Sequence, residues 1–249
     1  MTDILQILRD YGLLLLVGQY PNGPLGGLAI TFAMAVLGIL LAFPLGVLLA
    51  LGRISPFALF SWPSTVIVYV ARGVPLIMLI FWMYYFLPVA TGRPVSGFST
   101  MVATLVVYQA SYIAEIVRAG IEGLPKGQME AGRSLGLSYL QTMRKVILPQ
   151  ALYNMVPTLL SQFISTIKET SLGYVIGVNE LTFAANQINT TLLTKPFQVF
   201  AILAAVYFAL CFSLTLITHQ LERTVTARRA SAPTRGVPQV QPAVVIASE

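Results

Sequence analysis

Residues 122–150, EGLPKGQMEAGRSLGLSYLQTMRKVILPQ, form a polar insert between two long apolar segments. Pro125 precedes a first short helix, expected over about residues 127–135. Gly136 should end that helix, because glycine readily adopts the left-handed conformation of a helix C-terminus. Ser138 and Gln141 then give a capping-box signature at the start of a second helix, which is expected to end at Pro149. The insert therefore predicts a helix, a tight turn and a second helix.

These two helices are amphipathic, and three interpretations follow. The apolar residues are Met129, Leu135, Leu137, Leu140, Met143, Ile147 and Leu148, and the charged residues are Lys126, Glu130, Arg133, Arg144 and Lys145. The element could dock against a soluble partner, or it could be a connecting loop that lies on the bilayer. A DNA-binding helix-turn-helix fits loosely, but a hydrophobic segment on each side fixes the insert at the membrane surface.

Particular residues of the insert resemble a known motif. Glu130, Ala131 and Gly132, with Gly136 six positions after the glutamate and Pro149 at the end, resemble the EAA loop of bacterial ABC-transporter permease subunits. Two residues depart from that pattern, because Gly132 stands where the family usually has a second alanine and Val146 where it usually has isoleucine. Both replacements are small or apolar, so the resemblance holds.

The wider resemblance covers residues 25–222 and is to the polar amino-acid uptake permeases, the histidine, glutamine and glutamate/aspartate group. Residues 114–118 (AEIVR), 125–128 (PKGQ) and 169–172 (ETSL) carry it. It implies the type I importer fold, in which two permease subunits form the pathway and two ATP-binding subunits drive it. An external solute-binding protein delivers the amino acid, and the EAA loop docks into a cleft on the ATP-binding subunit.

The composition is that of an integral membrane protein. The 249 residues are 56% hydrophobic and only 10% charged, and the mean hydropathy is +0.78. One cysteine, Cys211, and one histidine, His219, provide neither a disulfide nor a metal cluster. No catalytic constellation or cofactor motif occurs, and without a G-x-x-x-x-G-K-[ST] motif the chain is not expected to hydrolyse ATP.

The apolar segments predict an all-α polytopic membrane protein with five transmembrane helices. The expected spans are residues 25–51, 57–88, 98–117, a fourth beginning at Gln150, and 196–218. Residues 57–88 are either one steeply tilted helix or an interfacial piece followed by a span that starts near Val74. Residues 1–24 are expected to lie at the interface, residues 182–194 to form a polar connection, and residues 223–249 to be a disordered tail.

The distribution of basic residues predicts the orientation. Arg53, Arg118, Lys126, Arg133, Arg144, Lys145, Arg223, Arg228, Arg229 and Arg235 fall on one side, against Arg9, Arg93 and Lys195 on the other. By the positive-inside rule the polar insert and the C-terminus are cytoplasmic and the N-terminus is outside. The resemblance implies that the membrane is the bacterial inner membrane. The net charge of +6 needs no nucleic acid to explain it.

The expected fourth span has one polar side. Gln150, Asn154, Thr158, Ser161, Ser165 and Lys168 recur at helical spacing and fall within one stripe. Lipid does not tolerate such a stripe, so it faces either a water-accessible pathway or another helix. Lys168 and Glu169, followed by Gly173 and Gly177, suggest a broken helix, where polar solutes often bind.

Charged residues within the spans are candidates for contacting a solute. Glu115, in the third span, should face protein or water, and Arg118 is its neighbour one helical turn away. Arg72 and Lys168 could meet a carboxylate, and Glu115 and Glu169 an ammonium group. Alternatively, Lys168 and Glu169 neutralise charges within the helix bundle and never touch the solute, and the pair of Glu115 and Arg118 is structural.

The prediction is therefore a permease subunit of an ATP-driven importer of polar amino acids. Residues 81–86 (FWMYYF) resemble the glutamate/aspartate permeases slightly more than the basic-amino-acid permeases. The second permease could be identical or different, and the remaining surface contacts lipid. The alternative is an ion-coupled secondary transporter or channel that acts alone.

Overall fold

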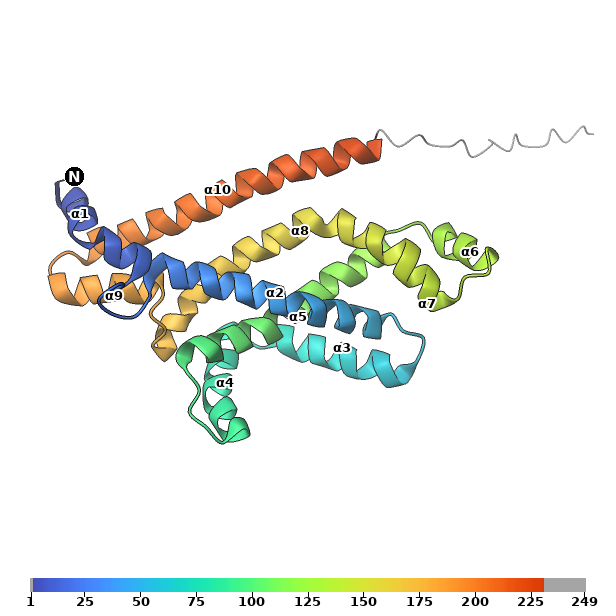
Figure 1. Ribbon diagram of the computed structural model, residues 1–249, viewed down its shortest axis with the longest axis horizontal. Helices are drawn as coiled ribbons and strands as arrows, with labels where there is room; N and C mark the ends of the chain where they lie inside the picture. Colours follow the sequence, from blue (N-terminus) through green and yellow to red (C-terminus); the bar gives the residue numbers. More distant parts are fainter. Residues whose placement is uncertain (1, 231–249) are drawn as a thin grey trace, which may run out of the picture.

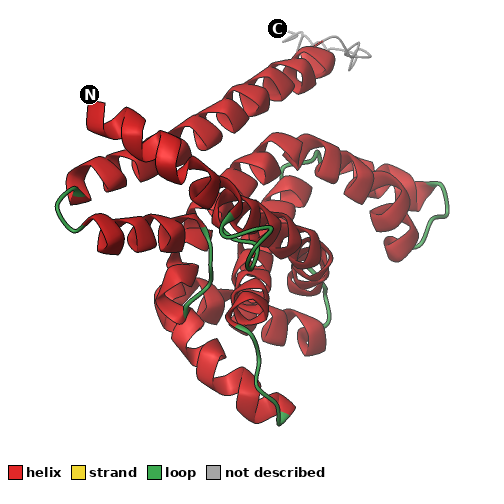
Figure 2. Ribbon diagram, turned by 60° about the vertical axis from the view of Figure 1, so that its left-hand side comes forward, coloured by secondary structure: helices red, strands yellow, loops and turns green. Residues whose placement is uncertain are grey.

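The computed structural model describes residues 2–230, with side chains from residue 4 to residue 223, and nearly all of this part is helical (Figure 1). The helices are α1 (Thr2–Val17), α2 (Gly27–Arg53), α3 (Ala58–Gly73), α4 (Leu76–Thr91), α5 (Gly97–Glu122), α6 (Gly127–Ser134), α7 (Tyr139–Thr142), the π-helical turn η1 (Met143–Ile147), α8 (Leu148–Glu169), the 3-10 helix η2 (Thr170–Ile176), α9 (Leu181–Leu192) and α10 (Pro196–Ala230). Figure 2 shows these helices joined by short loops. Residues 2–230 contain no strand, only isolated bridges between Gly18 and Leu25 and between Gly27 and Glu180. The predicted all-α class is confirmed.

Within the described part of the chain, three helices are long and apolar enough to cross a membrane: α2, α5, and α10 over Pro196–Arg223. The pair α3 and α4 meets the same criterion together, which gives up to four spans. The 22 residues of α8 are enough to cross a bilayer, but the polar side of this helix lowers its hydropathy. The count of five spans therefore stays a prediction.

The centre of the bundle is the packing of α2 on α5. Small residues let the two backbones approach closely. A Cβ atom added to Gly46 would lie 2.6 Å from Cγ2 of Ile113, and one added to Gly38 would lie 3.1 Å from Cβ of Leu105. Between helices in a membrane, such close contact supplies the attraction that the hydrophobic effect supplies in water. This pair is the frame on which α3, α4 and α8 are placed.

The segment expected over residues 57–88 is not one tilted helix. It is broken into α3 and α4, which are bent by 110° at Val74 and Pro75. Pro75 has no N–H group and disfavours helical geometry at Val74, whose backbone is extended (φ −100°, ψ 135°). Figure 1 shows α4 leaving the bundle at a steep angle to α3. Its outer side is apolar, with an open hollow of about 480 Å³ lined by Phe81, Trp82, Tyr85, Phe86 and Val89.

The second helix of the polar insert does not end at Pro149, as the sequence analysis expected. It continues from α7 through η1 into α8 without a break. In the π-helical turn, N–H of Leu148 donates to C=O of Met143, five residues back. This wider turn places Pro149 in the first turn of α8, where a missing N–H costs little. The insert and the helix with the polar stripe are therefore one continuous element.

Two further expectations are wrong. The supposed polar connection at residues 182–194 is largely the helix α9, whose buried residues Leu181, Ala184, Ala185 and Ile188 pack against α1 and α10. The supposed tail does not begin at residue 223, because α10 continues to Ala230. Its last residues, such as Ala227 and Arg228, are good helix formers, and no glycine or proline interrupts them. The rest of the expected tail, residues 231–249, lies outside the described residues.

Candidate functional site

The polar insert forms a hairpin of two short helices, α6 and α7, at the end of the molecule opposite α1 and α9 (Figure 1). Gly136 has φ +80° and lies in the turn after α6. N–H of Gly136 donates to C=O of Arg133 (3.0 Å) and N–H of Leu137 to C=O of Gly132 (3.2 Å), which is the Schellman pattern. The capping box of Ser138 and Gln141 is also formed, with both of its hydrogen bonds present. The predicted helix, turn and helix are confirmed.

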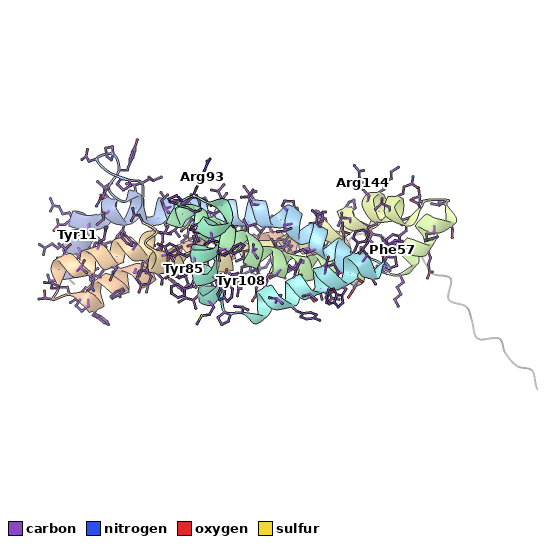
Figure 3. All side chains as sticks on the ribbon, turned by 90° about the horizontal axis from the view of Figure 1, so that it is seen from below. Tyr11, Phe57, Tyr85, Arg93, Tyr108 and Arg144 are labelled. Carbon is purple, nitrogen blue, oxygen red and sulfur yellow. The ribbon has the colours of Figure 1, made fainter. Side chains whose placement is uncertain are left out.

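The surface of the hairpin combines exposed apolar side chains with charges. Leu135 is 82% exposed and Leu140 is 72% exposed. Glu130, Ala131, Arg133, Arg144 and Lys145 are exposed around them, whereas Gly132 is buried. Figure 3 shows Arg144 at the same end of the molecule as Phe57, far from Tyr11. Exposed leucines flanked by charges are typical of a surface that binds another protein.

The polar stripe lies on the side of α8 that faces away from the core. Its members Gln150, Thr158, Ser161 and Lys168 are exposed, and Asn154 and Ser165 are half-buried. The buried residues of the helix are Ala151, Met155, Ile164, Thr166 and Ile167. This orientation favours a water-accessible pathway over packing within the chain, because the chain's own core contacts the apolar side of α8.

A hollow of about 440 Å³ lies between α5 and α8 beside the stripe. Asn154 and Thr158 of α8 and Glu115 of α5 line it, together with Gly120 and Gly123. It therefore brings together three of the residues that the sequence analysis selected, Glu115, Asn154 and Thr158. The other stripe residues do not line it.

A chain of hydrogen bonds connects α8 to the centre of α5. Nε2 of Gln162 donates to Oε1 of Gln109 (2.6 Å), and Nε2 of Gln109 donates to Oε2 of Glu169. Gln109 is fully buried. Glu169 was predicted from the sequence to be a site residue, but neither glutamine was. An amide in the middle of an otherwise apolar span is the signal that could have identified Gln109.

Glu115 is the centre of an ionic cluster. Arg53 at the end of α2 and Arg118 on α5 both donate to its carboxylate, and Nη1 of Arg72 at the end of α3 lies 3.6 Å from Oε2. The guanidinium groups of Arg53 and Arg72 also lie over the rings of Tyr69 (5.4 Å) and Tyr112 (5.1 Å). The expected pair with Arg118 is confirmed, and two cations are added to it. One carboxylate therefore connects α2, α3 and α5.

A second buried carboxylate, Glu180, was not selected from the sequence. It caps α9 by accepting hydrogen bonds from N–H of Thr182 and Phe183, both 2.8 Å, and from the Tyr207 hydroxyl at 3.2 Å. N–H of Leu181 donates to Oγ1 of Thr31 (3.1 Å), so α2, α9 and α10 meet here. Burial raises the pKa of Glu180 from its ordinary 4.5 to about 7, although the backbone donors oppose the shift.

The raised pKa of Glu180 predicts a pH dependence of stability. The folded state binds the proton more tightly than the unfolded state, so the stabilisation is complete below pH 4.5 and is lost as the pH rises to about 7. The shift corresponds to about 3 kcal/mol over this interval. In detergent, the melting temperature should fall across it, and Glu180→Gln should flatten the curve. Glu130→Gln, at an exposed position, is the control, and an unchanged curve in Glu180→Gln contradicts the assignment.

Comparison with known proteins identifies the family. Residues 42–227 match the family described as "Binding-protein-dependent transport system inner membrane component". The chain belongs to this family. It is therefore an inner membrane component, and the ABC-transporter permease resemblance is confirmed.

Individual relatives agree with the family. The chain is 36% identical over 208 residues to the inner membrane amino-acid ABC transporter permease protein YhdY of Escherichia coli; the match covers 82% of this chain but 57% of YhdY. It is 38% identical over 211 residues to the glutamate transport system permease protein GluD of Corynebacterium glutamicum, covering 83% of this chain and 76% of GluD. A crystal structure of an amino acid ABC transporter with histidines superposes with a TM-score of 0.78 at 29% identity, covering 90% of this chain and 99% of the other.

Family membership establishes the role of the subunit. The chain is a non-catalytic permease subunit, and ATP hydrolysis belongs to a separate subunit of the transporter. A stand-alone secondary transporter or channel is not favoured. Among the described residues, no group of three or more His, Cys, Asp or Glu side chains could hold a metal ion.

Proposed function

We propose that this chain is the permease subunit of an ATP-driven importer of polar amino acids, with glutamate, aspartate or glutamine favoured. The outward-facing polar stripe of α8 is the observation that supports it. Thr158, Ser161 and Lys168 are exposed on α8, whose other side packs against α5 and α10. Polar side chains on this side of α8 are costly in contact with lipid, so the stripe lines a pathway for a polar solute.

The hollow and the hydrogen-bonded chain supply groups for an amino acid along this pathway. A zwitterion needs an acceptor for its ammonium group and a donor for its carboxylate. Glu169 offers a carboxylate, and the neighbouring Lys168 offers a cation that is exposed. We assign these residues, with Gln150, Asn154, Ser165 and Glu115, to lining or gating the pathway. The relative GluD, named for glutamate transport, supports an acidic substrate.

The α6–α7 hairpin couples the chain to the ATP-binding subunit in this proposal. Its exposed Leu135 and Leu140 provide an apolar contact, and Glu130 and Arg133 provide charges around it. The excess of basic residues on this side supports a cytoplasmic location for the hairpin and the C-terminus and an outer location for the N-terminus. A second permease, identical or different, completes the pathway, and an external solute-binding protein delivers the substrate.

Blocking the stripe tests the pathway. The double variant Ser161→Leu and Ser165→Leu adds two apolar side chains without changing charge. In vesicles that contain the whole complex, uptake of radiolabelled glutamate should fall about tenfold or more, because the desolvated substrate loses polar partners. ATP hydrolysis by the complex should continue, and vesicles without the ATP-binding subunit should show no uptake. Parallel assays with glutamine, histidine and arginine determine the specificity.

Ser213→Leu is the matched control. Ser213 is exposed on α10, and its hydroxyl donates to C=O of Ala209 (2.7 Å) much as the hydroxyl of Ser161 donates to C=O of Pro157 (3.2 Å). This control should transport like the unmodified protein. Normal uptake in the double variant would place the pathway on another helix and leave the stripe as a contact with the second permease.

A further inference from the structure

The contact between α6 and α7 is made through a residue that has no side chain. Gly132 is the buried residue of α6, and it faces Thr142 of α7. A Cβ atom added to Gly132 would lie 2.5 Å from Cγ2 and 2.9 Å from Oγ1 of Thr142. Carbon atoms in contact lie 3.5–4.0 Å apart, so even one methyl group does not fit. The two helices are therefore as close as glycine allows.

Thr142 cannot easily turn away from this contact. Its side chain is fully buried, and its hydroxyl donates to C=O of Ser138 (3.0 Å). The two branches on Cβ restrict its χ1 angle. Ser138 is itself fixed by the capping box with Gln141. An added methyl group at residue 132 therefore displaces α6 rather than the threonine.

Thr142 also belongs to the helix that carries the polar stripe. It ends α7 and leads directly into η1 and α8, with Met143 and Ile147 of η1 buried in the core beside α2 and α5. A displacement of α6 thus acts on the first turn of a continuous helical element that ends at Glu169. The connection contains no flexible loop.

We propose that Gly132 is a positioning residue, at which α6 engages Thr142 so that movement of the hairpin is passed directly to α8. The proposal rests on the coupling role proposed for the hairpin. It also explains the departure of this loop from the EAA pattern, because an alanine at residue 132 does not fit opposite Thr142. The contact between Gly132 and Thr142, rather than residue 132 by itself, sets the distance between α6 and α7.

The experiment compares four variants in vesicles that contain the complete complex. Gly132→Ala should lower both uptake and substrate-stimulated ATP hydrolysis per assembled complex about tenfold, because overpacking shifts α6. Gly127→Ala, on the same helix with nothing within 4 Å of its added Cβ atom, should be unaffected. Gly132→Ala combined with Thr142→Ser removes the 2.5 Å contact with Cγ2 and leaves the 2.9 Å contact with Oγ1, so it should restore a measurable part of both rates. Thr142→Ser alone should have a small effect.

The outcomes separate this proposal from the coupling role itself. Normal rates in Gly132→Ala, or a loss that Thr142→Ser does not reduce, overturn the positioning role. If Gly132→Ala does not assemble, the double variant must recover part of both assembly and uptake, and failure to recover any also overturns the positioning role. Leu135→Asp alters only the exposed surface of the hairpin. If that variant transports normally, the coupling role fails, whatever the result at residue 132.

Discussion

Replacing Glu115 by alanine is expected to lower the free energy of unfolding by about 3–5 kcal/mol and to reduce the amount of folded protein in the membrane. The Arg53 side chain is only 8% exposed, and its ion pair is with Glu115. Removing the carboxylate leaves this guanidinium buried with no counter-charge. Arg72 loses the same partner, so the ion pairs that join the ends of α2 and α3 to α5 are lost. Thermal unfolding of the detergent-solubilised protein measures the effect.

Glu122→Ala is the matched control for Glu115→Ala. Glu122 is a carboxylate on the same helix, it also pairs with Arg118, and it is 54% exposed. Exposed ion pairs contribute at most about 1 kcal/mol, so this variant should unfold close to the temperature of the unmodified protein. If the two alanine variants lose similar stability, Glu115 is not the centre of the ionic cluster.

Gly136→Val is expected to lower uptake by about tenfold or more while the protein still inserts in the membrane. At φ +80° a β-branched side chain is strongly disfavoured, and relaxing the strain opens the turn between α6 and α7. The hydrogen bonds from Gly136 to Arg133 and from Leu137 to Gly132 would then be lost. ATP hydrolysis by the complex should become insensitive to substrate. Uptake and ATP hydrolysis in vesicles test both expectations.

Gly136→Asn distinguishes backbone strain from a simple need for space. Nothing lies within 4 Å of a Cβ atom added to Gly136, so crowding at Cβ does not limit the substitution. Asparagine tolerates the left-handed conformation better than valine does. The asparagine variant should therefore keep most of the uptake. Equal losses in the two variants would show that the conformation of the turn is not the cause.

Local signals in the sequence predicted local structure well. Gly136, Ser138 and Gln141 lie within six residues of one another, and their turn and cap are formed as expected. The helix end predicted at Pro149 was wrong because the effect of this proline depends on how its neighbours are buried. Met143 and Ile147 pack into the core, and the widened turn between them accommodates the proline. Helix α9 was missed because the threonines and asparagines between its apolar residues hid a helical periodicity of buried positions.

Contacts between distant residues could not be predicted in this way. Arg53 and Glu115 are separated by 62 positions, and Gln109 and Glu169 by 60. A single sequence contains no record of which spans are neighbours, so Glu115 could be paired only with Arg118, one turn away. The polar stripe was evident from its spacing. The side of the molecule that the stripe faces depends on how α8 packs, so it could be determined only from the structure.

The break between α3 and α4 has a consequence for optical measurements. Both tryptophans of the chain are on this broken segment, Trp62 on α3 and Trp82 on α4. They are 71% and 75% exposed. Tryptophan fluorescence of the unmodified protein therefore reports on the surroundings of these two helices, and Trp62→Phe restricts it to α4. Quenching by brominated acyl chains then measures how much of the aromatic side of α4 touches lipid. The change in this quenching when the complex assembles measures how much of that side another subunit covers.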